Sequence, residues 1–329
     1  MWRRYVRLVL VGAVEGSRQA LEALLEAGCN VVYVFTLAPE YARRHSDFAD
    51  LRPLCEGFGV PMSGINNINE PEVLEQLRTL DPDYLLVLGW SQIVKPELLR
   101  LPRRGAIGFH PALLPEGRGR AALPWTILLG LKRSGCTLFF MDEGMDSGDI
   151  ICQQAFDIAP DETAQTLYRK VTSTLRVMIA EIAPGLSRGE LPRRRQDHAH
   201  ATYTAKRTGR DGLIDWQQPA HKVWTLIRAV GAPYPGAFTF YRQRRLIVWE
   251  ADLVPRANYV GVVGQVLRSE PGGVLMQCGE GYLRLVTVQE EGQAMMAATQ
   301  YFTRVHDVLG VDWLTLYEQN LRSIRGDKS

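Results

Sequence analysis

The chain has 329 residues and a formal net charge of +2 at pH 7, with 46% hydrophobic and 22% charged residues. These values are typical of a folded globular protein, the length predicts two domains, and no apolar run is long enough to cross a bilayer. The small net charge does not by itself imply nucleic-acid binding.

The first residues predict a strand and no signal peptide. Arg3 and Arg4 run directly into the apolar segment 5–11, and no small-residue cleavage site follows. The five cysteines are widely scattered and form no CxxC pair: Cys29, Cys55, Cys136, Cys152 and Cys278. This pattern favours buried free thiols in a reducing compartment over metal or redox chemistry. We therefore expect a cytoplasmic protein without a metal site.

The first half of the chain alternates strand-like apolar runs with segments of helical periodicity. Strands are expected at 6–14, 30–37, 84–88, 106–109 and 137–141. Helices are expected at 17–27, 70–80, 121–131 and 163–182. The alternation predicts an α/β fold, a parallel sheet covered on both faces with a ligand crevice at its carboxyl edge.

The composition changes after the last of these helices. The stretch from Pro192 to Arg210 is rich in Arg, Lys and His, and we expect a solvated linker there, with a grip on phosphates as the alternative. One helix at 219–230 then precedes strand-like runs at 237–241, 246–251, 262–267, 274–278 and 282–288. A small β-barrel of the OB type fits this pattern. The expected organisation is a catalytic domain over 1–190, a basic linker over 191–210, an OB-like domain over 211–315 and a tail over 316–329.

Two loop residues are the strongest candidates for chemistry. His110 ends a predicted strand and enters a loop that Pro111 and Pro115 stiffen, which lowers the entropy cost of holding the ring in one geometry. Asp146 lies in the loop after the next predicted strand. Because neighbouring parallel strands bring their carboxyl-end loops to one rim, we expect His110 and Asp146 to meet. A single histidine at the edge of a sheet is more often structural than catalytic. The prediction of a catalytic site therefore depends on His110 and Asp146 occurring together.

A longer pattern contains both residues: HPxLLP from His110, then RG at Arg118, a strand, and DxGD from Asp146. This pattern resembles the folate-dependent formyltransferases, a family that includes methionyl-tRNA formyltransferase, glycinamide ribonucleotide formyltransferase and the sugar N-formyltransferases. Segments 212–216 and 233–238 look like the second domain of that family. The resemblance implies a Rossmann-like formyltransferase domain, a small OB-like barrel after it, and 10-formyltetrahydrofolate as co-substrate of a one-carbon transferase.

The resemblance also implies an Asn-His-Asp catalytic set. His110 and Asp146 match it, but Gly108 stands where the family has Asn. His110 would polarise the oxyanion that forms when an amine attacks the formyl carbon, and Asp146 would orient the ring and favour the imidazolium. Three explanations compete for Gly108: another side chain or a water donates, which we favour; the enzyme is slow; or the acyl donor or reaction differs.

The resemblance places the formyl-folate pocket on two loops, where backbone groups and apolar walls suit a pteridine. Its residues are Leu88, Gly89, Trp90 and Ile93 on one loop and Met141, Asp142, Glu143 and Gly144 on the other. Trp90 is either a wall of this pocket or ordinary core packing. The turn 11–17 lacks GxGxxG, so we interpret it as a tight turn and helix cap.

The acceptor amine is predicted from the segment Gly119 to Trp125, which resembles the sugar enzymes more than the tRNA enzyme. We expect a nucleotide-linked amino sugar, with Arg118 or Arg120 either on its phosphates or simply exposed at the rim. The alternatives are a methionyl-tRNA formyltransferase, a non-catalytic folate-binding homologue and a formyl-folate hydrolase. No membrane partner is expected, and the apolar second domain is compatible with a homodimer.

Overall fold

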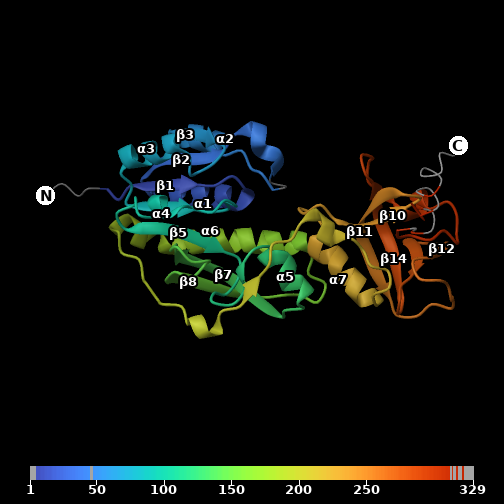
Figure 1. Cartoon of the computed structure of the whole chain (residues 1–329). Coiled ribbons are helices and arrows are strands. Elements are labelled where there is room, and N and C mark those ends of the chain that lie inside the picture. The colour runs from blue at the N-terminus through green and yellow to red at the C-terminus, as the bar shows by residue number, and fades with distance from the viewer. Residues whose placement is uncertain (1–4, 45–46, 312, 314–315, 318–320, 322–329) are drawn as a thin grey trace. The chain divides into compact units, whose positions relative to one another are not determined.

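The computed structural model describes residues 5–44, 47–311, 313, 316–317 and 321. The chain forms two compact units, Met1–Lys206 and Arg207–Ser329 (Figure 1). Most of the tail expected over 316–329 lies outside the described residues.

The first unit is built on a seven-stranded sheet with the order β3-β2-β1-β4-β5-β7-β8. The strands are β1 (Leu8–Val11), β2 (Val31–Leu37), β3 (Met62–Ile65), β4 (Tyr84–Val87), β5 (Gly105–His110), β7 (Arg133–Phe140) and β8 (Ile150–Asp157). The strands from β1 to β5 pair in parallel, whereas β7 pairs antiparallel with both β5 and β8. The α/β class expected from the sequence is therefore confirmed, with a mixed rather than a parallel sheet.

The parallel arrangement predicted for β5 and β7 is wrong. In the antiparallel register, His110 lies opposite Thr137 and Ile107 lies opposite Phe140. β8 closes this edge and was not predicted as a strand. An apolar run indicates only that a strand is buried on both faces. It does not indicate whether the adjacent strand of the sheet is parallel or antiparallel.

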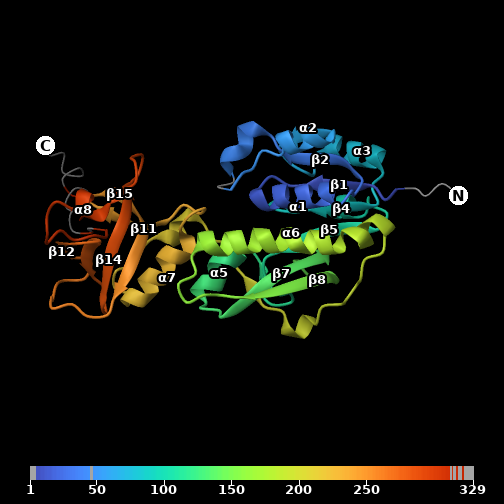
Figure 2. The same ribbon diagram turned by 180° about the vertical axis from the view of Figure 1, so that it is seen from behind.

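Helices cover both faces of this sheet. α1 (Glu15–Glu26) and α6 (Ala164–Arg188) lie side by side on one face (Figures 1 and 2). On the other face, Leu77 of α3 (Pro71–Leu80) and Leu98 of α4 (Pro96–Leu99) pack in one apolar cluster with strand residues such as Phe35. Shorter elements are η1 (Pro39–Arg44), α2 (Arg52–Phe58) and α5 (Ala122–Leu128). Among the described residues, no helix combines the length and apolarity that a membrane span requires.

The second unit is an antiparallel sheet covered by α7 (Ala220–Val230), with the short η3 (Gly209–Gly212) before it. The sheet order is β10-β11-β14-β13-β12, and β15 pairs with β14. The elements are β10 (Ala237–Tyr241), β11 (Arg244–Val254), β12 (Val266–Glu270), β13 (Gly273–Gln277), β14 (Tyr282–Glu290), β15 (Met296–Ala297) and α8 (Ala298–Tyr301). This is the separate β domain that the sequence predicts. β12 begins four residues later than expected, after Gly264 at φ +80°.

The five cysteines are all free, and four of them are buried. Burial raises the pKa of the Cys55 thiol to about 11, and burial likewise raises that of the partly buried Cys152 to about 11. At neutral pH these groups therefore stay protonated and behave as small apolar side chains.

The start of α6 gives a test of the fold. Thr163 Oγ1 accepts the N–H of Thr166 at 3.2 Å, and Thr166 Oγ1 accepts the N–H of Thr163 at 3.0 Å. We expect Thr163→Ala to lower the free energy of unfolding by about 1 kcal/mol, because the first turn loses its cap. Urea denaturation measures this loss. Thr163→Ser keeps the hydroxyl and is the control, and an equal loss in both variants would contradict the capping role.

Candidate active site

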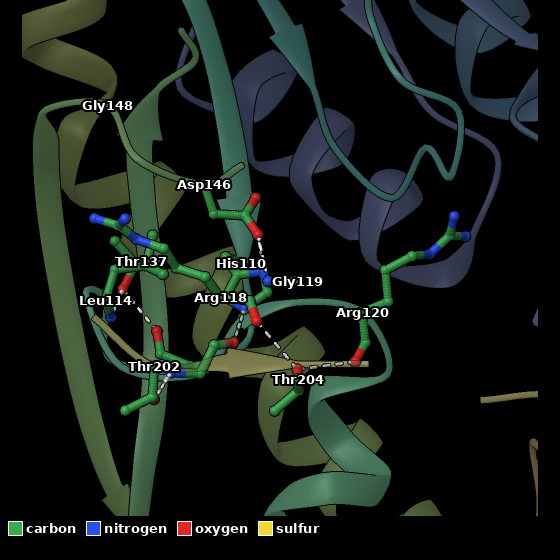
Figure 3. A network of polar contacts seen from close by, with 12 residues as sticks. His110, Leu114, Arg118, Gly119, Arg120, Thr137, Asp146, Gly148, Thr202 and Thr204 are labelled. Carbon is green, nitrogen blue, oxygen red and sulfur yellow. Dashed lines mark hydrogen bonds and ion pairs between the residues drawn. The ribbon is translucent and has the colours of Figure 1, made fainter. Parts of the chain in front are cut away.

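The imidazole of His110, at the carboxyl end of β5, is held between two oxygens. Its Nε2 lies 2.7 Å from the carbonyl oxygen of Gly117, and its Nδ1 lies 3.6 Å from Asp146 Oδ2 (Figure 3). Because a carbonyl oxygen only accepts, Nε2 carries a proton. The side chain is only 7% exposed. Nδ1 is thus the nitrogen that remains able to take up a proton, and a carboxylate stands beside it.

Asp146 reaches His110 from the loop 141–149 between β7 and β8. Its Oδ2 also accepts the N–H of Gly119 at 2.8 Å (Figure 3). The meeting of the two side chains was predicted, but the reason given for it is wrong. β7 ends opposite Ile107, so this loop has to turn back along β5 to bring its carboxylate to the strand end. Asp146 adopts the left-handed conformation, at φ +51°, which Asp tolerates better than most residues.

Apolar groups surround Gly108, the position of the family Asn. A Cβ on Gly108 would lie 2.9 Å from Cζ of Phe139 and 3.0 Å from Cγ of Met141. Phe139 is itself buried, with 4% of its surface exposed. A larger residue therefore does not fit at 108 unless the Phe139 ring moves, and any donor that replaces the amide lies elsewhere.

The two arginines predicted to bind phosphate lie in different environments. Arg118 is buried, at 2% exposure, and not at the rim, and its guanidinium faces Gln196 and Tyr203. Arg120 is exposed, and its side chain points away from the His110–Asp146 pair (Figure 3). Of the two, only Arg120 is accessible to a ligand in this conformation.

The residues predicted to hold the folate lie on loops after β4 and β7. Trp90 and Met141 pack against the same apolar cluster, Leu88 is buried, and Ile93 is 85% exposed. Gly89 has φ +67°. Among the described residues, the buried indole N–H of Trp90 has no hydrogen-bond partner. A buried donor without a partner is costly, and a polar edge of the pteridine would supply that partner, so the chain has a group suited to this co-substrate.

The acidic end of the second folate loop is exposed. Asp142 Oδ1 accepts the N–H of Gly144 at 3.1 Å and the hydroxyl of Ser147 at 2.7 Å. Glu143 forms an ion pair with Arg100. These contacts fix the turn that begins the loop carrying Asp146.

A cavity of about 290 Å³ lies in a different part of the first unit. It is lined by residues of β2, β3 and α2, among them Thr36, Cys55 and Met62. None of its lining residues belongs to the predicted site. Among the described residues, no three His, Cys, Asp or Glu side chains gather in a way that could hold a metal ion.

The segment after α6 contributes to the site, which its sequence pattern does not predict. Gln196 donates its amide N–H groups to the carbonyl oxygens of Asp146 and Gly148, at 2.8 and 2.7 Å. The two-residue strand β9 (Tyr203–Thr204) pairs with β6 (Arg118–Gly119). The basic composition of this region directed attention to its charges, and strands this short leave no periodic signal.

Two family models match the chain. Residues 8–182 match the model described as "Formyl transferase", and residues 207–306 match "Formyl transferase, C-terminal domain". With the α/β unit and the His–Asp loop pair, these matches define the class: the chain belongs to the formyl transferase family. A methionyl-tRNA formyltransferase from Caldanaerobacter subterraneus subsp. tengcongensis is 33% identical over 299 residues, which is 90% of this chain and 96% of that protein.

Solved structures share the fold at low sequence identity. HypX from Aquifex aeolicus, in complex with tetrahydrofolic acid, gives a TM-score of 0.63 at 18% identity, covering 91% of this chain and 47% of that chain. The present chain thus spans about half the length of HypX. WlaRD, a sugar 3N-formyl transferase, gives a TM-score of 0.60 at 15% identity and covers 88% of this chain and 100% of that chain. The protein is an enzyme of formyl transfer.

The packing around Gly108 yields a prediction. We expect Gly108→Ala to lower the free energy of unfolding by about 1–3 kcal/mol, because the added methyl group meets the Phe139 ring. Thermal and urea unfolding measure the loss. Gly108→Ala combined with Phe139→Leu is the matched control and should recover part of the difference. A Gly108→Asn variant as stable as the native protein and faster in formyl transfer would instead mean that the native enzyme is slow for lack of this amide.

Proposed function

We propose that this protein is an N-formyltransferase that moves a formyl group from 10-formyltetrahydrofolate to the amine of a nucleotide-linked amino sugar. The observation that carries the catalytic part is the His110–Asp146 pair. Nδ1 and Oδ2 lie 3.6 Å apart while Nε2 is held by the carbonyl of Gly117. This arrangement offers one basic nitrogen with a carboxylate beside it.

Formyl transfer requires the attacking amine to lose a proton and the tetrahedral oxyanion to be stabilised. His110 Nδ1 accepts that proton, and Asp146 stabilises the resulting imidazolium by its opposite charge. The 3.6 Å separation exceeds a hydrogen bond, so Asp146 does not engage Nδ1 directly. Bound formyl-folate supplies the activated formyl group, and Trp90 with its neighbouring loops would hold the pteridine. When the oxyanion collapses and the bond from the formyl carbon to the folate nitrogen breaks, the His110 imidazolium donates its proton to that departing nitrogen, which completes the transfer.

The charge pattern of the second unit supports a small acceptor over tRNA. Arginines on its sheet are already paired with carboxylates: Arg242 with Asp307, Arg244 with Glu290, Arg245 with Glu291, and both Arg268 and Arg284 with Glu270. Binding of tRNA depends on neutralising many phosphates, and a paired arginine contributes less to that. In the first unit, the exposed Arg120 is a candidate contact for the phosphates of a nucleotide sugar.

Methionyl-tRNA is the second candidate acceptor. It is favoured by the methionyl-tRNA formyltransferase that is 33% identical, because the similarity extends over 96% of that protein. Both acceptors present a primary amine to the same pair of side chains, so the chemistry at His110 is common to both. We place the enzyme in the cytoplasm, which the five free thiols support, since reduced cysteines persist there.

The acceptor is identified by incubating the protein with 10-formyltetrahydrofolate and one amine at a time. The panel contains nucleotide-linked amino sugars, simple amines and charged initiator tRNA, and mass spectrometry detects the product. We expect a formylated sugar nucleotide. Formylation of tRNA alone would establish the second candidate. Formate released without an amine would indicate a hydrolase, and folate-induced thermal stabilisation without any product would indicate a binding protein.

The two catalytic roles are tested by His110→Asn and Asp146→Asn. Each is expected to lower kcat/KM by at least about a hundredfold, because the base or its charge partner is lost. Circular dichroism and thermal melting should stay close to those of the native protein. Glu116→Gln, at an exposed neighbouring position, is the control and should retain activity. Activity within tenfold of the native enzyme in both variants would remove the pair from the mechanism.

A further inference from the structure

The segment 194–204, here called the strap, lies between the two regions that match the family models, which end at 182 and begin again at 207. We propose that Gln196, a residue of the strap, is a positioning residue that sets the place of Asp146 relative to His110. The proposal rests on the proposed function of that pair. It assigns a role in formyl transfer to a residue outside both regions that match the family models.

The backbone of the strap is hydrogen-bonded to both loops that carry the pair. Toward the Asp146 loop, Arg194 and Ile150 exchange backbone hydrogen bonds of 3.0 and 2.8 Å. Toward the other loop, the hydroxyl of Thr202 accepts the N–H of Gly117 at 2.8 Å, and the Thr202 carbonyl accepts the N–H of Arg118 at 2.9 Å (Figure 3). Gly117 is the residue whose carbonyl holds His110 Nε2. The strap therefore joins the support of the imidazole to the support of the carboxylate.

Gln196 is the side chain that completes this link. It is 6% exposed, and both ends of its amide are used. The nitrogen donates to the carbonyls of Asp146 and Gly148, while the oxygen accepts from Arg118 Nη2 at 2.7 Å and Nε at 3.2 Å. Two carbonyls of the loop are thereby fixed on either side of Ser147. These bonds hold the left-handed turn at Asp146 from which its carboxylate points to His110.

Arg118 fixes Gln196 in turn. Its guanidinium donates from Nη1 to the hydroxyl of Tyr203 at 3.0 Å and from Nη2 to Nδ1 of His198 at 3.0 Å. A guanidinium has donors only, so its two hydrogen bonds to Gln196 leave the amide nitrogen directed at the loop. A buried cation is costly unless its donors are satisfied, and neutral groups of the strap supply these partners. Arg118 of the RG motif is thus an anchor for the strap rather than a phosphate contact.

The strap affects the geometry of the His110–Asp146 pair. The 3.6 Å separation between Nδ1 and Oδ2 depends on two loops, and the strap is hydrogen-bonded to both of them. A displacement of about 1 Å in a catalytic group costs up to about a hundredfold in rate. Loss of Gln196 should therefore lower kcat, while the KM for formyl-folate should change little, because Gln196 bonds to the loop 141–149 at Asp146 and Gly148 and not at the predicted folate residues 141–144.

The test compares Gln196→Leu with Gln196→Glu. Leu removes both functions of the amide, whereas Glu keeps an acceptor for Arg118 and loses the donors to the loop carbonyls. We expect kcat to fall by about ten- to a hundredfold in both variants, with the KM for formyl-folate within twofold of native. Asp197→Asn, an exposed neighbour on the strap, is the matched control and should leave kcat unchanged. Native kcat in folded Gln196→Leu and Gln196→Glu would overturn the proposal.

A second measurement is independent of turnover. The NMR signals of the His110 ring carbon and proton should move in Gln196→Glu and stay in place in Asp197→Asn, because only the former changes the position of Asp146. Unmoved signals would contradict the positioning role of Gln196, whether or not the native protein shows turnover. Absence of turnover in the native protein would refute only the proposed function. If Gln196→Leu does not fold, Tyr203→Phe replaces it. That variant removes one partner of Arg118, and it should lower kcat in the same direction by a smaller factor.

Discussion

The site depends on one constraint, the return of the loop 141–149 along an antiparallel strand pair. β7 ends beside Ile107, three residues before His110, so Asp146 cannot reach the imidazole from the strand end directly. The loop reverses through a left-handed Asp146, and its carbonyls are held from outside by Gln196. Without that turn, the Asp146 carboxylate would not lie close to the His110 imidazole.

The polar groups that hold this turn are buried, and burial determines how they affect the stability of the fold and the geometry of the site. A buried carbonyl, amide or guanidinium without a partner destabilises the fold, whereas a fully paired set is close to neutral and defines one geometry. Arg118 and Gln196 satisfy each other and the loop at the same time. Such a network fixes position more than it adds stability, which suits a site that depends on the 3.6 Å separation between Nδ1 and Oδ2.

The second unit differs from the first in how it presents charge. Its arginines and carboxylates pair across neighbouring strands, as Arg244 does with Glu290 and Arg245 with Glu291, so positive charge is locally balanced. The family relationship extends over this unit, and its paired arginines would contribute less than free ones to neutralising phosphates. Under the proposed function, the choice between a nucleotide sugar and tRNA depends on the binding surface, because the chemistry proposed for His110 would serve either amine.

Much of the fold followed from sequence because it depends on local pattern. Apolar runs and helical periodicity located β1, α1, β2, α7 and β10 within a few residues, and the spacing of His110 and Asp146 indicated a common site. The gap at Gly108 was also visible, since it is a property of a single position.

What the tertiary structure decided is the relation between distant segments. Four features depend on pairings between residues far apart in sequence. They are the direction of β7, the packing of Phe139 beside Gly108, the burial of Arg118 and the position of Gln196. Strand direction and a single buried amide leave no periodic trace in the chain, because each is defined only by the neighbours that folding brings together. The sequence by itself therefore determined the elements and the candidate pair, and tertiary packing decided how that pair is held.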